Sequence, residues 1–122
     1  MTEVTFKTRD GDKTFKVGDL CHYHVGSDTY AMVVVGFKGV GSKVEILTKN
    51  VKVVNTKVWP DQEWSVVVGV DGKPETYGEK AFNIHRTKCG NMIQPIHHQN
   101  KGSVYGAYQL RTGFYHYYDP SF

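Results

Sequence analysis

The chain has 122 residues, of which 39% are hydrophobic and 22% charged, and its formal net charge is +3. This length and composition predict one folded domain over residues 1–122 and exclude both a disordered chain and a separate catalytic domain. Apolar runs such as Met32–Val35 are far shorter than the ~20 residues of a membrane-spanning helix, so we expect no membrane partner.

The cysteines and the N-terminal residues bear on the compartment. Cys21 and Cys89 are too few for a disulfide framework, which favours a reducing environment. The first residues alternate between polar and apolar types and lack the apolar stretch of a secretory signal. We therefore expect a cytoplasmic protein. Its basic residues are scattered, which leaves small anions as plausible a partner as nucleic acids.

The first third of the chain predicts β-strands separated by glycine-containing turns. Val4–Lys7 and Lys13–Lys16 flank Asp10-Gly11, a pair that tolerates the positive φ angles of a tight hairpin turn. Leu20–His24 and Tyr30–Phe37 follow as further strands. The second of these is apolar on both faces, and its β-branched residues favour a central strand over a buried helix.

The middle of the chain continues the same pattern. Lys43–Leu47 and Val51–Asn55 are predicted as strands. Glu63–Val68 and Pro74–Tyr77 flank Asp71-Gly72, which predicts a long hairpin.

The last third predicts one strand, a long loop and a hairpin. Lys80–Arg86 alternates as a strand does, although its beginning also tolerates a short helical turn. Residues 87–103 are rich in glycine, proline and polar types and predict the longest loop. Val104–Leu110 and Phe114–Tyr118 flank Thr112-Gly113 as a C-terminal aromatic hairpin. The predicted fold class is therefore all-β: a small SH3-like or barrel-like antiparallel domain.

The histidines and cysteines form no recognisable metal or catalytic motif. His22 and His24 share one face of a strand, while Cys21 points to the other. His85 and Cys89 lack a second pair of ligands at the spacing of a zinc site. Cys89 has no acid placed to orient a base, and no phosphate-binding glycine motif precedes a helix. We expect no metal, no cofactor and no enzymatic activity.

Aromatic rings interleaved with a few cations are the remaining candidate for binding. They are Trp59, Trp64, Phe82, Tyr105, Tyr108, Tyr115, Tyr117 and Tyr118, beside Arg86, Lys88, Lys101 and Arg111. Rings stack on nucleobases for roughly 1–3 kcal/mol each, and a guanidinium binds phosphate through two hydrogen bonds. In the last predicted strand Phe114 and His116 take one face while Tyr115 and Tyr117 take the other. Covering both faces requires association of chains, so we predict an oligomer.

Several short motifs follow one another over most of the chain. They are Lys16-Val17-Gly18-Asp19, Ser27-Asp28-Thr29-Tyr30-Ala31, Val33-Val34-Val35, Asp61-Gln62-Glu63-Trp64, Asp71-Gly72-Lys73 and Leu110-Arg111-Thr112-Gly113. In type and order they resemble the motifs of the Thoeris anti-defence sponges, a family of small phage proteins.

The resemblance implies a β-rich protein that binds a cyclic ADP-ribose isomer or a related cyclic nucleotide. Such a protein sequesters this immune signal, without cleaving it, in the cytoplasm of the infected bacterial host. The resemblance also implies a homo-oligomer, a dimer or hexamer, with ligand pockets where subunits meet. Thr29 stands where many relatives have arginine, which leaves open which signal is bound.

The resemblance also suggests which residues bind the ligand. Arg111 is carried over by a matched motif, whereas Phe82 and Asn91 follow from residue type and approximate position. The other candidate ligand-binding residues are Arg86, Trp59, Tyr30 and Asp28.

Two other functions fit the same residues. An SH3-like nucleic-acid-binding or protein-binding module would use the aromatic and basic surface against a polymer, with nucleic acid the less expected partner. Its binding to nucleic acid would weaken steeply as salt rises. A phage structural or assembly protein would use the surface as an interface and bind no small ligand.

Overall fold

The computed structural model of the chain describes residues 2–25, 28–57, 62–87, 90–96 and 109–117. All strand pairing in this part is antiparallel, which confirms the predicted all-β fold class. A 3-10 turn, η1 (Gly41–Lys43), separates two of the strands. The strands are β1 (Glu3–Thr8), β2 (Gly11–Lys16), β3 (Leu20–Val25), β4 (Asp28–Lys38), β5 (Glu45–Val51), β6 (Val53–Lys57), β7 (Glu63–Val66), β8 (Thr76–Thr87), β9 (Gly90–Pro95) and β10 (Leu110–Thr112).

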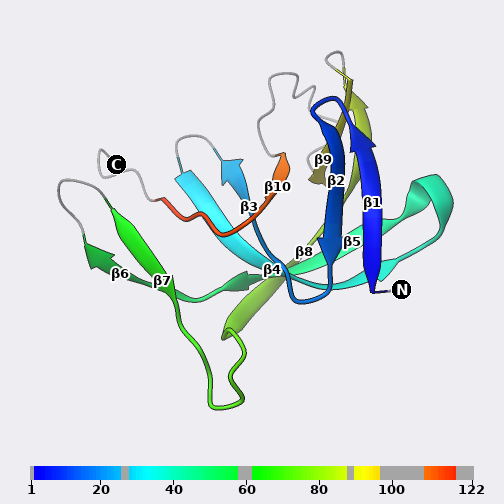
Figure 1. The fold of residues 1–122 in the computed structure, drawn as a ribbon. Coiled ribbons are helices and arrows are strands. Elements are labelled where there is room, and N and C mark those ends of the chain that lie inside the picture. Colours follow the sequence, from blue (N-terminus) through cyan, green and yellow to red (C-terminus); the bar gives the residue numbers. More distant parts are fainter. Residues whose placement is uncertain (1, 26–27, 58–61, 88–89, 97–108, 118–122) are drawn as a thin grey trace.

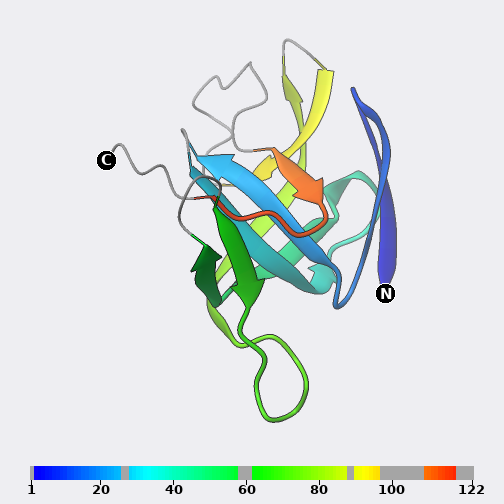
Figure 2. The ribbon, with the colours of Figure 1, turned by 60° about the vertical axis from the view of Figure 1, so that its left-hand side comes forward.

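The main sheet has the strand order β10-β3-β4-β5-β8-β9 and is strongly curled (Figure 1). Its two edge strands approach each other, since β9 contacts both β10 and β1. The hairpin β1–β2 stands beside this junction, and the arrangement is barrel-like. The hairpin β6–β7 forms a separate two-stranded sheet that diverges from the main one (Figure 1), while its Val53 and Val66 pack against the outer face. The loop that follows β7 projects from the molecule (Figure 2).

The first hairpin forms as its turn residues predict. Gly11 has a φ of 105°, a conformation that glycine adopts without strain. On one face of the hairpin, Phe6 and Phe15 are buried with their ring centroids 6.1 Å apart. On the other face, the hydroxyls of Thr5 and Thr14 are 2.8 Å apart. The alternation of apolar and polar residues therefore directs one face of the hairpin into the core.

Strand β4 is buried on both faces, which confirms the central strand predicted from its apolar run. Met32 and Val34 point into the inner core, the larger hydrophobic cluster enclosed by the curled sheet and β1–β2. Ala31 and Val33 point to the opposite, outer face, where a smaller cluster forms. The inner core consists of Phe6, Phe15, Cys21, Tyr23, Met32, Val34, Val44, Ile46, Phe82, Ile93 and Leu110.

The turn at Asp71-Gly72 forms a shorter hairpin than predicted. Val68 and Pro74 make an isolated bridge, and the Gly69 N–H donates to the Lys73 carbonyl at 2.8 Å. Beyond this bridge β7 pairs with β6, and β8 pairs with β5. Strand β8 also begins before the predicted Lys80–Arg86 and continues one residue beyond it.

The prediction of one long loop over residues 87–103 is wrong for Gly90–Pro95, which forms β9 and pairs with β8. Met92 and Ile93 are fully buried, so packing stabilises a strand that the composition does not suggest. Gly90, at a φ of 111°, makes the reversal from β8 possible. Residues 97–108 lie outside the described part of the chain.

The predicted C-terminal hairpin about Thr112-Gly113 is also wrong for the residues that the structure describes. Leu110–Thr112 pairs with β3 instead, and Tyr117 makes a bridge with Thr29 of β4. Leu110 is fully buried in the inner core, which draws this segment to the edge of β3. Gly113, at a φ of 95°, then redirects the chain.

Candidate functional site

Residues 113–117, here called the strap, run across the outer face of the sheet (Figure 1). At one end the Gly113 N–H donates to the Leu20 carbonyl at 3.0 Å. At the other end the Thr29 N–H donates to the Tyr117 carbonyl at 2.8 Å, and the Tyr117 N–H donates back at 3.0 Å. Between these anchors Phe114 packs against the outer cluster. The strap therefore brings its own aromatic side chains against β3 and β4.

Three rings meet where the strap crosses β3. The ring centroids of His22 and His24 are 5.8 Å apart, and that of Tyr115 lies 5.7 Å from His22 and 6.4 Å from His24. Arg111 lies directly opposite His22 in the register of β10 and β3, so its side chain extends from the same face. We call His22, His24, Arg111 and Tyr115 the histidine face. Tyr115 is 50% exposed, so solvent reaches this group.

The two histidines of this face are held by different hydrogen-bond partners. Nδ1 of His22 is 2.9 Å from the carbonyl oxygen of Gly113, at the start of the strap. Nδ1 of His24 is 2.6 Å from the hydroxyl oxygen of Thr29, on β4. Each ring is therefore fixed by the segment that packs beside it.

Partial burial favours the neutral form of both imidazoles. Desolvation lowers the pKa of His22 below its ordinary 6.5, and the charge of Arg111 lowers it further, against an opposing hydrogen bond to Gly113. Desolvation also lowers the pKa of His24, with additional contributions from His22 and Arg111. At neutral pH the histidine face thus combines one permanent cation with two uncharged imidazoles.

The next strap residue, His116, lies between β4 and β7. Its ring centroid is 4.5 Å from that of Trp64 and 6.3 Å from that of Tyr30. The Trp64 Nε1–H donates to the side-chain oxygen of Gln62 at 2.9 Å. Desolvation lowers the pKa of His116, while the carboxylate of Asp28 acts in the opposite direction. Tyr30 and Asp28, both predicted ligand-binding residues, are therefore neighbours of the strap.

The other predicted ligand-binding residues lie elsewhere. Arg86 and Asn91 are opposite each other on the β8–β9 hairpin, where the Asn91 carbonyl accepts a hydrogen bond from the Arg9 N–H at 3.0 Å. Phe82 is 0% exposed and packs against Tyr23 in the inner core. Trp59 lies outside the described residues. One chain thus brings Arg111, Tyr30 and Asp28 to the surroundings of the strap and leaves Arg86 and Asn91 on another strand pair.

The predicted binding residues did not include His22, His24 or His116, and Tyr115 was predicted only as one ring of the aromatic and basic surface. The alternation of β3 correctly placed both histidines opposite Cys21, which is buried in the inner core. No local signal shows that residues 113–117 return across β3, because that path depends on pairing between distant segments. In the described part of the strap, Phe114, Tyr115 and His116 all find neighbours within one chain. Packing within one chain therefore accounts for Phe114 and His116, while Tyr115 stays 50% exposed.

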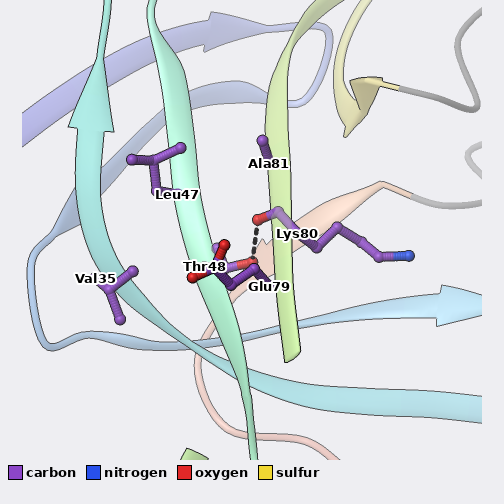
Figure 3. Close-up of a pocket in the computed structure, with 6 residues that line it drawn as sticks. All are labelled: Val35, Leu47, Thr48, Glu79, Lys80 and Ala81. Carbon is purple, nitrogen blue, oxygen red and sulfur yellow. Dashed lines mark hydrogen bonds between the residues drawn. The ribbon is translucent and has the colours of Figure 1, made fainter. Parts of the chain in front are cut away.

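Two shallow hollows lie away from these residues. One, of about 240 Å³, is lined by Val35 of β4, Leu47 and Thr48 of β5, and residues 79–81 of β8 (Figure 3). The Thr48 hydroxyl donates to the Lys80 carbonyl at 2.7 Å, and the side chain of Lys80 points away from Val35 and Leu47. The second, of about 490 Å³, shares Val35 and is lined by Val17 and Gly18 between β2 and β3, by residues 33–35 of β4, and by residues of the segment 72–76. Neither includes a predicted ligand-binding residue.

The described residues offer little for metal or nucleophilic chemistry. They contain no group of three or more histidine, cysteine, aspartate or glutamate side chains that could hold a metal ion. Burial raises the pKa of Cys21 to about 12, with a smaller contribution from Asp19, so its thiol stays protonated at neutral pH.

A separate finding concerns membranes: none of the helical structure in the described ranges is long and apolar enough to cross a bilayer. Comparison of the chain with protein-family models, with curated proteins and with solved structures found no match.

Proposed function

We propose that this chain binds a phosphate-bearing nucleotide of the cyclic ADP-ribose type at the histidine face and sequesters it unchanged in the cytoplasm of an infected bacterium. The observation that carries the proposal is the position of Arg111 opposite His22, beside three rings whose centroids are 5.7 to 6.4 Å apart. A guanidinium next to exposed ring surface offers a phosphate and a base separate places on one face.

The energetics call for a second copy of the chain. Nanomolar capture of a signal corresponds to about −12 kcal/mol. Stacking of one base contributes roughly 1–3 kcal/mol, and Arg111 is the one arginine of the histidine face that could bind phosphate. The histidine face of a single chain therefore provides less than the binding free energy that nanomolar capture requires. We therefore propose a homo-oligomer, a dimer or hexamer, in which another subunit covers the ligand. Arg86 and Asn91, exposed together on the β8–β9 hairpin, are the candidates that this subunit would contribute.

Two features support binding without cleavage. The thiol of Cys21 is buried and protonated, so it is no nucleophile at neutral pH. The Nδ1 atoms of His22 and His24 contact a carbonyl and a hydroxyl rather than the carboxylate that orients a catalytic histidine. These features favour binding of a ligand over its cleavage at the histidine face.

Isothermal titration of the full chain with cyclic ADP-ribose isomers tests the proposal. Arg111→Ala should lower the affinity at least tenfold, because a charge-assisted hydrogen bond to phosphate contributes about 1.5–3 kcal/mol. The control is Lys16→Ala, which removes an exposed ammonium paired with Glu3 at 3.8 Å at the far end of the β1–β2 hairpin. This control should bind as the wild type does.

Native mass spectrometry of the purified protein gives the subunit number and the mass of any retained ligand. Absence of heat with every isomer at micromolar concentrations would refute the proposed function. Binding to DNA or RNA that weakens steeply with salt would favour the SH3-like nucleic-acid module instead.

A further inference from the structure

His22 and His24 are alike in position but differ in what their Nδ1 atoms contact. The partner of His22 Nδ1 is the Gly113 carbonyl oxygen, at 2.9 Å. A carbonyl oxygen can only accept, so this nitrogen must carry the hydrogen. In a neutral imidazole the other nitrogen then has none. Nε2 of His22 is therefore a hydrogen-bond acceptor.

The partner of His24 Nδ1 is the hydroxyl of Thr29, a residue only 2% exposed. If Nδ1 donated to this oxygen, the hydroxyl hydrogen would be left buried with no acceptor among the described residues, which is costly. Thr29 therefore donates to Nδ1, and Nε2 of His24 carries the hydrogen as a donor.

Both rings keep their Nε2 atoms available. No hydrogen bond joins either atom to another residue in the parts of the chain that the structure describes. The two rings are nearly perpendicular, at 84°, and the half-exposed ring of Tyr115 lies against both. One acceptor and one donor thus lie beside a stacking surface.

We propose that His22 and His24 read a planar ligand edge that carries one hydrogen-bond donor and one acceptor, as a nucleobase does. His22 Nε2 would accept from the exocyclic amino group of a base such as adenine, and His24 Nε2–H would donate to a neighbouring ring nitrogen. Thr29 is the positioning residue that sets the tautomer of His24. The proposal rests on the proposed function for the nucleotide class, but the tautomers are a property of the free protein.

The first test measures the two tautomers by long-range ¹H–¹⁵N correlation of the imidazole nitrogens in the full, ligand-free chain at pH 7.5. We expect the hydrogen on Nδ1 in His22 and on Nε2 in His24. Thr29→Val keeps the branched shape but removes the hydroxyl, so His24 should become a mixture of tautomers while His22 stays unchanged. The same tautomer in both wild-type rings would overturn the proposal.

The second test compares adenosine 5′-diphosphate with purine riboside 5′-diphosphate, which lacks the amino group. Wild type should bind the second nucleotide roughly threefold to tenfold more weakly, as expected for one lost hydrogen bond. His22→Phe keeps an aromatic ring without the acceptor, and it should bind both nucleotides equally.

Equal binding of the two nucleotides by wild type would overturn the base-reading role and leave the proposed function standing. Discrimination between them, together with no binding of any cyclic ADP-ribose isomer, would refute the proposed function alone. Failure of both nucleotides to bind would overturn the nucleobase assignment, whatever the tautomers.

Discussion

The two faces of β4 carry two kinds of packing. The inner core joins buried aromatic and aliphatic residues from the strands of the sheet and from β1–β2. The outer cluster has three buried members, Ala31, Val33 and Val51, and partly buried hydrophobic residues cover them. The inner core is closed by the sheet itself, whereas the outer cluster is closed in part by the strap.

This difference separates stability from binding. A closed apolar core provides most of the favourable free energy of folding and tolerates little change. The outer face mixes half-buried histidines with Phe114 and is secured by a few backbone hydrogen bonds at each end of the strap. We therefore expect the inner face to determine whether the chain folds, and the outer face to determine what it holds.

The largest expected effect comes from Phe82→Ala. Removal of this fully buried ring from the inner core should lower the free energy of unfolding by about 3–5 kcal/mol, through lost burial and a residual cavity. Urea denaturation followed by tryptophan fluorescence measures the loss. Tyr77→Ala, at a half-exposed ring, is the control and should cost well under half as much. A cost for Phe82→Ala below about 1 kcal/mol would contradict the closed inner core.

A smaller loss is expected from Phe114→Ala on the outer face. Its ring is only partly buried against the outer cluster, so the free energy of unfolding should fall by about 1–2 kcal/mol. Ligand affinity should fall as well, because Phe114 holds the strap that carries Tyr115. The same denaturation and titration experiments report both quantities. A destabilisation equal to that of Phe82→Ala would remove the distinction between the faces.

The smallest effect is a dependence of stability on pH. Burial lowers the pKa values of His22, His24 and His116 in the folded chain below the ordinary 6.5. The unfolded chain then binds more protons at mildly acidic pH, so the free energy of unfolding should decrease as the pH falls through and below 6.5. Urea midpoints between about pH 7.5 and pH 5.5 measure this slope.

Amide exchange locates the pH effect, and the strap should lose protection before Ile93 and Phe82 do. Replacement of the three histidines by glutamine is the control and should flatten the slope. A wild-type stability that rises on acidification would contradict the neutral, half-buried state of these rings.

Sequence patterns predicted those parts of the fold whose cause is local. Asp10-Gly11 specifies the first hairpin, and the apolar run of β4 specifies a strand covered on both sides. Strand β9 was missed because Asn91 and Pro95 resemble loop residues, and its burial depends on contacts with distant strands. For the same reason the path of β10 and the strap could not be predicted from the turn at Gly113.

The candidate site also combines features that local sequence patterns predict with features that depend on long-range contacts. Arg111 was predicted from its motif, and the alternation of β3 placed His22 and His24 on a shared face. The strap brings Tyr115 to these three residues by crossing β3, and this long-range contact is not visible in any local pattern. Phe82 shows the reverse case, since a ring of the type that stacks on bases is instead a central part of the core.

The backbone of Thr29 has a consequence for how copies of this chain interact. Its N–H and carbonyl are both paired with Tyr117, so the strap covers a stretch of sheet edge at the start of β4. When a strap detaches, that edge becomes a template for any extended segment of matching sequence, and the best match is the strap of another molecule. Reciprocal exchange would then give intertwined pairs with every native contact preserved, so concentrated or gently acidified samples should be checked for such swapped species.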